Sequence, residues 1–104
     1  MKSHNDKVLS LLGLAARGRN LVSGEFSTEK AVKEKKAALV IVGTDASDNT
    51  KKMFTNMCTF YKTPICFYSD KEGLGKAIGK ETRASVAVTD PGMAANILKN
   101  LEES

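Results

Sequence analysis

Residues 37–43, AALVIVG, decide the fold of this chain, because the run is almost wholly apolar and is β-branched at Val40, Ile41 and Val42. A strand with apolar side chains on both sides of its pleat is buried on both faces of a sheet. The run therefore predicts an internal strand that is covered by a layer of other elements on each face.

The segments around this run predict alternating helices and strands. Apolar residues recur at helical spacing over residues 5–17, 24–36, 48–61, 70–80 and 91–102, and short apolar runs predict further strands at 21–22, 65–69 and 84–88. Strands that alternate with helices predict an α/β domain, a layered sheet with helices on both faces. The length of 104 residues fits one domain over 1–104.

Several polar residues predict where the helices begin. Asn5 or Asp6 caps the first helix. Ser47 ends a loop as a helix cap, and Asp90 caps a last helix that starts at Pro91. Ser69 and Glu72 form a capping box, which predicts that Ser69 opens the helix over 70–80.

Composition favours a small protein with an anionic partner. The net charge of +4 attracts polyanions, although the same charge also keeps a small protein soluble. Cys58 and Cys66 lie in apolar stretches and predict buried thiols, because two cysteines and the single His4 complete neither a disulfide framework nor a zinc site. No long apolar run begins the chain, so we expect a cytoplasmic protein without a membrane partner.

The candidate catalytic motifs are weak. Gly73, Gly75 and Gly79 resemble a dinucleotide loop, but the predicted helix starts before them, so they favour close packing instead. Asp45 and Asp48 lie at loop–helix junctions, where the helix dipole favours acidic residues, and a metal or acid–base role stays an alternative. We therefore expect no enzyme, no cofactor and no bound metal.

Basic side chains gather near two predicted helix starts, which offer free amides and a positive dipole to phosphate. One start lies near Gly24 and the other near Ser47. The basic residues before, within or after them are Arg17, Arg19, Lys30, Lys33, Lys51 and Lys52. A solvated helix face is the alternative for each lysine taken alone.

A set of motifs along nearly the whole chain resembles a known family. The motifs are Leu12-Gly13-Leu14-Ala15-x-Arg17, Leu21-Val22-Ser23-Gly24, Lys30-Ala31-Val32, the stretch 38–52, Tyr61-Lys62-x-Pro64, Leu74-Gly75-x-Ala77-Ile78-Gly79-Lys80 and Val86-Ala87-Val88-x-Asp90. They resemble the kink-turn RNA-binding ribosomal proteins of the L7Ae/L30e type, and especially the short bacterial members. The resemblance implies a three-layer α/β/α sandwich around a four-stranded mixed sheet.

The family holds RNA at the start of its second helix, which corresponds here to residues 24–30, GEFSTEK. Gly24 and Lys30 match the family pattern, whereas Phe26 and Ser27 stand where the family has an amide-and-carboxylate pair for sheared G·A base pairs. Ser27 can still bond a base edge, and Phe26 either stacks on a base or packs inside. We expect Phe26 and Val32 to face the core.

The second contact of the family is the loop before the last strand, here residues 80–84, KETRA. Glu81 matches an acidic residue that the family often has there. Arg83 either contacts phosphate or a base plane, or is a solvated loop residue, and the sequence favours neither.

Together these observations predict a non-catalytic protein that binds structured RNA, either kink-turn or ribosomal RNA, as a monomer associated with translation or the ribosome. The predicted contact residues are Arg17, Arg19, Gly24, Glu25, Phe26, Ser27, Lys30, Lys33, Asp45, Ser47, Lys51, Glu81, Thr82, Arg83 and Ala84. The alternative is a protein-interaction module of the same fold with weak or no RNA binding.

Overall fold

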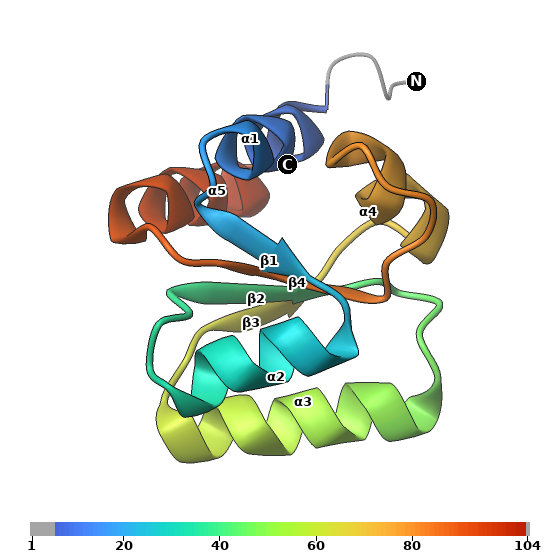
Figure 1. Ribbon diagram of the computed structural model, residues 1–104, viewed down its shortest axis with the longest axis vertical. Helices are drawn as coiled ribbons and strands as arrows, with labels where there is room; N and C mark the ends of the chain where they lie inside the picture. The colour runs from blue at the N-terminus through green and yellow to red at the C-terminus, as the bar shows by residue number, and fades with distance from the viewer. Residues whose placement is uncertain (1–5, 104) are drawn as a thin grey trace.

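The computed structural model describes residues 6–103, and its elements follow the predicted order (Figure 1). The helices are α1 (Lys7–Arg17), α2 (Glu25–Lys33), α3 (Asp48–Tyr61), α4 (Lys71–Ala77) and α5 (Pro91–Glu103). The strands are β1 (Leu21–Ser23), β2 (Leu39–Val42), β3 (Ile65–Phe67) and β4 (Ser85–Val88).

The four strands form one mixed sheet in the order β1-β4-β2-β3. β4 is antiparallel to both β1 and β2, whereas β2 and β3 are parallel. The predicted mixed sheet is therefore confirmed. β2 and β4 lie inside the sheet, and β1 and β3 are its edges.

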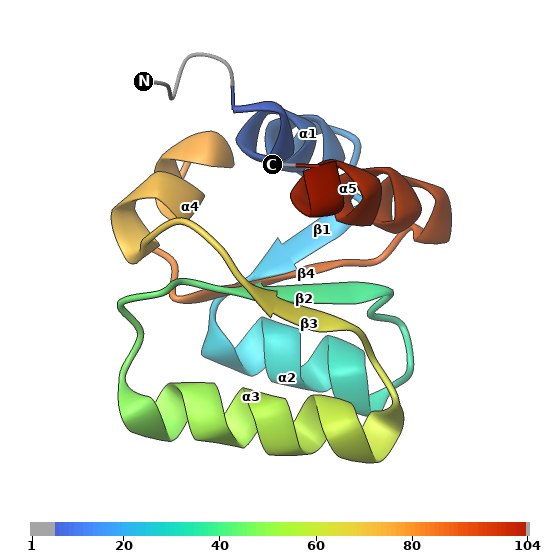
Figure 2. The same cartoon turned by 180° about the vertical axis from the view of Figure 1, so that it is seen from behind.

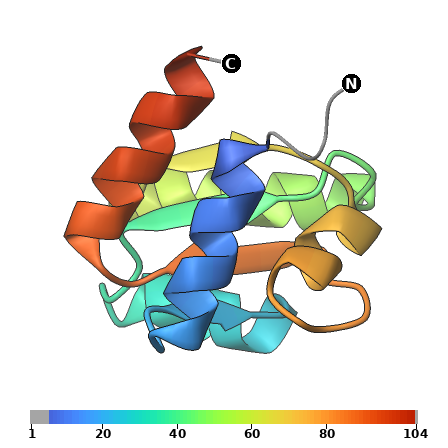
Figure 3. The same cartoon turned by 90° about the horizontal axis from the view of Figure 1, so that it is seen from above.

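Helices cover both faces of the sheet and make the predicted three layers. Figures 1 and 2 show α1, α4 and α5 on one face and α2 and α3 on the other, and Figure 3 shows α1 lying between α5 and α4. Along β2, Leu39 and Ile41 join the first core, and Val40 and Val42 join the second. All four side chains are fully buried, which confirms a strand covered on both faces.

Three helix starts have the predicted type of cap. The side chain of Asp6 accepts a hydrogen bond from the Leu9 amide at 3.0 Å, and that of Ser47 accepts one from the Thr50 amide at 3.1 Å. Asp90 accepts from the Met93 amide at 2.9 Å. Each cap satisfies one amide that has no acceptor inside its helix.

The predicted capping box at Ser69 is wrong. α4 begins at Lys71, and its cap is Asp70, whose carboxylate accepts from the Gly73 amide at 2.7 Å. Ser69 has a left-handed φ of 61°, and its carbonyl accepts from the Thr44 amide and hydroxyl, both at 2.8 Å. These tertiary bonds hold Ser69 in the turn, so the helix starts one residue later.

Gly75 sets the path of the loop that follows α4. A Cβ at Gly75 would lie 2.6 Å from the carbonyl carbon of Glu81 and 2.9 Å from the Cα of Thr82. The missing side chain therefore lets residues 81–82 pass directly over α4. This close approach is the packing role that we expected for a glycine in this segment.

Candidate nucleic-acid interface

The start of α2 presents unpaired backbone amides. Gly24 is the N-cap residue with a φ of 91°, and it has no side chain that could cap the helix. Its own amide donates to the Ser85 carbonyl at 2.9 Å, but the next amides of the first turn have no acceptor within the helix. This end of α2 therefore offers donors and a positive dipole to an anion.

The loop before β4 lies against this helix start. Arg83 Nε donates to Ser23 Oγ at 3.1 Å, directly before Gly24. Behind that bond, Ser85 Oγ donates to Thr28 Oγ1 at 3.3 Å, and both residues are fully buried. The structure thus brings together the two segments that the sequence predicted as contacts. The half-buried Arg83 is tied to β1 and is not a freely solvated loop residue.

Phe26 does not face the core, which corrects our expectation. Its side chain is 78% exposed, whereas Val32 is fully buried as expected. Since 3.6 residues make one helical turn, the inward stripe passes through Thr28, Ala31 and Val32, and Phe26 lies on the opposite side. Phe26 borders a hollow of about 290 Å³ lined by Glu29, Lys30, Lys33 and Glu34.

The two lysines of α2 differ in their surroundings. Lys33 Nζ lies 2.8 Å from the Glu29 carboxylate, and this hydrogen bond raises the pKa of Lys33. Lys30 is exposed and makes no ion pair within residues 6–103. Lys30 is therefore the α2 lysine whose charge is open to an outside anion.

α3 begins on the same side of the molecule as α2, at the right in Figure 1. The backbone links the two regions, because the Gly43 amide donates to the Ala84 carbonyl at 2.8 Å. Asp45 Oδ1 accepts from the Lys71 amide at 2.9 Å, so this carboxylate holds the loop to the start of α4. With Ser47 as a cap and Lys51 half-buried, the predicted residues of this region lie at the same end of the sheet as Ala84.

Arg17 and Arg19 do not lie at the α2 start itself. Both are exposed and line a groove of about 480 Å³ between the end of α1, strand β1 and the segment after α4. The groove also contains Lys80. Lys80 belongs to the predicted contact loop 80–84, but it was not among the individual residues that we predicted as contacts. Ser23 lines the groove too and so connects it with Gly24.

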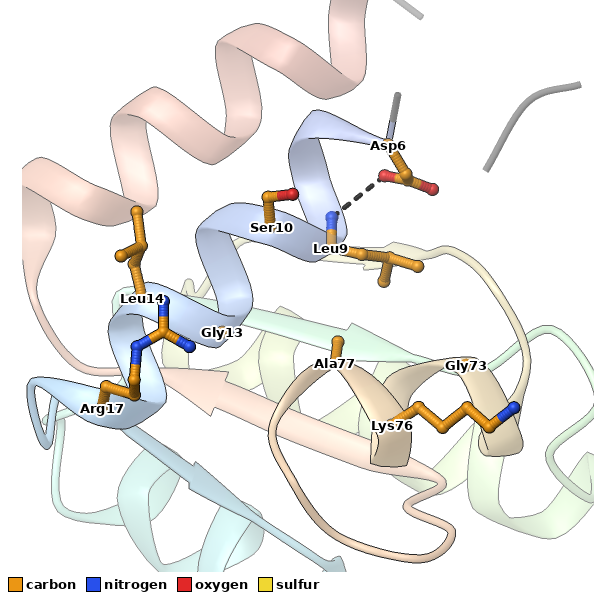
Figure 4. A pocket seen from close by; sticks show the side chains of 9 residues that line it. All are labelled: Asp6, Leu9, Ser10, Gly13, Leu14, Arg17, Gly73, Lys76 and Ala77. Carbon is orange, nitrogen blue, oxygen red and sulfur yellow. Dashed lines mark hydrogen bonds between the residues drawn. The ribbon is translucent and has the colours of Figure 1, made fainter. Parts of the chain in front are cut away.

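A second groove of about 650 Å³ is lined by residues of α1 and α4 (Figure 4). Its acidic residue is Asp6, whose second oxygen accepts from the Tyr68 hydroxyl at 2.9 Å. Burial, helped by this bond, raises the pKa of Tyr68 to about 12. Among residues 6–103 no three His, Cys, Asp or Glu side chains gather as a metal site, and His4 lies outside the described residues.

The two cysteines are free thiols. Cys58 is buried as expected, whereas Cys66 is only half-buried because it lies on edge strand β3. Burial raises the pKa of each thiol to about 11, so both stay protonated at neutral pH. Over the described part of the chain, no helix is both long and apolar enough to span a bilayer.

Comparison with known proteins agrees with this geometry. RNA-binding protein YlxQ of Bacillus subtilis (strain 168) is 45% identical over 92 residues, which are 88% of this chain and 92% of that protein. RNA-binding protein YlxQ of Enterococcus faecium is 34% identical over 103 residues, 97% of each chain. A solved Bacillus halodurans C protein of unknown function superposes with a TM-score of 0.89 at 40% identity, covering 92% of this chain and 97% of that one.

One family model matches residues 6–98, which is nearly the whole chain and includes every predicted contact residue. The mixed sheet, the glycine at the α2 start and the adjoining loop before β4 agree with the resemblance found in the sequence. The chain therefore belongs to the ribosomal protein L7Ae/L30e/S12e/Gadd45 family.

Proposed function

We propose that this chain binds structured RNA without changing it chemically, and that the start of α2 is the centre of the contact. One observation carries the proposal. The start of α2 has no side-chain cap and presents the exposed ring of Phe26, and the hydrogen bond from Arg83 to Ser23 holds the loop before β4 beside it. The names of the Bacillus and Enterococcus relatives, which are called RNA-binding proteins, support it.

Each part of this surface matches one feature of a folded RNA. The free amides of α2 can donate hydrogen bonds to one phosphate, whose charge the helix dipole attracts. Lys30, which has no ion pair within residues 6–103, can neutralise another phosphate. Phe26 offers a flat face on which an unstacked base can lie, and the Ser27 hydroxyl can bond a base edge. Splayed bases beside crowded phosphates occur at bulges and bends rather than in regular duplexes.

A kink-turn, whether free or within ribosomal RNA, is therefore the RNA that we propose as the target. In this arrangement residues 24–33 enter a widened groove, and residues 45–52 and 81–84 complete the contact surface. We further propose that one copy of the chain suffices and that it acts in the cytoplasm with the ribosome. The chemistry is recognition of shape together with neutralisation of phosphate.

The test uses Phe26 and a matched aromatic residue elsewhere. Phe60 on α3 is also 78% exposed, so the two substitutions Phe26→Ala and Phe60→Ala remove the same side chain from equally open positions. Affinity is measured by gel shift at low salt for a kink-turn RNA, a ribosomal RNA fragment and a regular duplex. We expect the wild type to prefer the kink-turn over the duplex.

Phe26→Ala should weaken kink-turn binding by roughly 5- to 150-fold, because stacking of one base on an aromatic ring contributes about 1–3 kcal/mol. Phe60→Ala should leave the affinity unchanged. Equal affinity of the Phe26→Ala variant and the wild type would refute the stacking role. If the protein bound none of the RNAs at low salt, the proposed function would be refuted. The alternative, a protein-interaction module of the same fold, would then be favoured.

A further inference from the structure

The groove that contains Arg17, Arg19 and Lys80 lies outside the α2 contact surface. Its other walls are Ala16 from α1, all of β1 and Ile78 after α4. Figure 1 shows β1 at the front of the sheet, with α1 above it and the segment after α4 beside it. A hollow of about 480 Å³ on this face is open to a ligand that runs along the outer edge of β1.

The charge of this groove is uncompensated. Of the residues that the structure describes, three with cationic side chains line it and none with a carboxylate does. Three lysines elsewhere are ion-paired, namely Lys33, Lys36 and Lys76. Within residues 6–103, none of the three groove cations forms such a pair. Exposed cations without acidic partners keep their full attraction for an outside anion.

The backbone of β1 adds donors and acceptors to the same groove. Among the described residues β1 pairs with β4 alone. There the Thr89 amide donates to the Asn20 carbonyl, and the Gly24 amide donates to the Ser85 carbonyl. Because successive residues of a strand point their backbone groups in opposite directions, Leu21 and Ser23 direct theirs to the open edge. The edge therefore offers amides to phosphate oxygens and carbonyls to 2′-hydroxyl groups.

We propose that this groove binds the sugar–phosphate backbone of an RNA stem that continues from the α2 site. The inference rests on the proposed function, since the stem belongs to the same RNA. Ser23 is the link, because it lines the groove, accepts a hydrogen bond from Arg83 and immediately precedes Gly24. The groove thus extends the contact from the distorted RNA segment to the regular stem beside it. Cations and protein backbone groups bind the phosphates and sugars of this stem, so the contact does not depend on base sequence.

The experiment compares two charge variants and two RNAs. The groove variant is Arg17→Gln/Arg19→Gln/Lys80→Gln. The control is Lys7→Gln/Lys62→Gln/Lys99→Gln, which removes three exposed cations elsewhere and so lowers the net charge of +4 by the same amount. One RNA contains only the kink-turn with minimal stems, and the other has both stems lengthened. Thermal unfolding by circular dichroism verifies that both variants are folded.

We expect the wild type to bind the long RNA more tightly than the short one and with a steeper salt dependence. Each phosphate contact makes the slope of log affinity against log salt steeper by about 0.7–0.9. Because the groove variant lacks three cations, its slope with the long RNA should be shallower than that of the wild type by about 2. A slope change of 2 is about 100-fold in affinity between 1 M and 0.1 M salt. With the short RNA the groove variant and the control should bind alike.

A single charge reversal, Lys80→Glu, gives an independent measurement and should weaken only the binding of the long RNA. If the wild type binds both RNAs equally, or if the groove variant and the control have the same slope with the long RNA, the groove is not a stem site, although the α2 site stands. If the wild type binds neither RNA, the proposed function itself is refuted.

Discussion

The structure leaves no space for a side chain at Gly75, close to the candidate interface. A methyl group there would collide with backbone atoms of Glu81 and Thr82 rather than with a movable side chain. Overpacking of this kind costs about 1–3 kcal/mol. We therefore expect Gly75→Ala to lower the free energy of unfolding by about that amount and to displace the loop before β4.

Chemical denaturation followed by circular dichroism measures the change, with Lys76→Ala as the neighbouring control. Lys76 is exposed, and its Nζ lies 3.8 Å from Glu72 Oε2. Because exposed ion pairs contribute little, Lys76→Ala should change the free energy of unfolding by less than about 0.5 kcal/mol. A Gly75→Ala protein as stable as the wild type would contradict the close packing described here.

Phe26 shows why the burial of a single residue could not be predicted from the sequence alone. Hydrophobicity favoured the core for Phe26, but the inward stripe of α2 is occupied by Thr28, Ala31 and Val32. Thr28 is a polar residue that the fold buries, because Ser85 Oγ supplies its hydroxyl with a hydrogen bond. That partner comes from a distant strand, so no local pattern could have identified it.

Among the elements, α5 begins with a side-chain cap. Asp90 accepts the hydrogen bond of the Met93 amide, and α5 buries Ile97 against the first core. Loss of an N-cap costs about 1 kcal/mol. We expect Asp90→Ala to lower the free energy of unfolding by about 0.5–2 kcal/mol, and Asp90→Asn, which retains a cap acceptor, to lower it less.

Thermal unfolding of the two Asp90 variants tests this prediction. Equal losses in the alanine and asparagine proteins would show that the cap bond is not the cause. The caps at Asp6, Ser47 and Asp90 were predictable because a cap is local, whereas Ser69 was misassigned because Thr44, 25 residues away, holds its carbonyl.

At the scale of the molecule, one phenol and two thiols that are partly or fully buried make the stability depend on pH in the alkaline range. The pKa of Tyr68 rises from 10.0 to about 12, and the pKa values of Cys58 and Cys66 rise from 9.0 to about 11, mainly because burial disfavours the ionised forms. The fold thus binds these protons more tightly than the unfolded chain. Their stabilisation is complete below pH 9 and is lost as pH rises through about 9–12.

Unfolding in guanidinium chloride at a series of pH values measures this loss. Tyr68→Phe also removes the hydrogen bond to Asp6, so it should be less stable than the wild type at pH 8 by about 0.5–1.5 kcal/mol. Its stability should then fall less steeply between pH 10 and 12. Parallel declines in both proteins would contradict a raised pKa of Tyr68.

The order of helices and strands, the buried strand at 39–42 and most helix starts were determined by the sequence itself, because periodicity and caps act between residues that are close in the chain. The mixed sheet followed only from the resemblance, since strand pairing joins distant segments. Tertiary structure alone decided that Phe26 is exposed, that Arg83 is tied to Ser23, and that Lys80 shares a groove with Arg17 and Arg19. These features arise where separate elements meet, and the geometry of such meetings depends on how the whole chain packs.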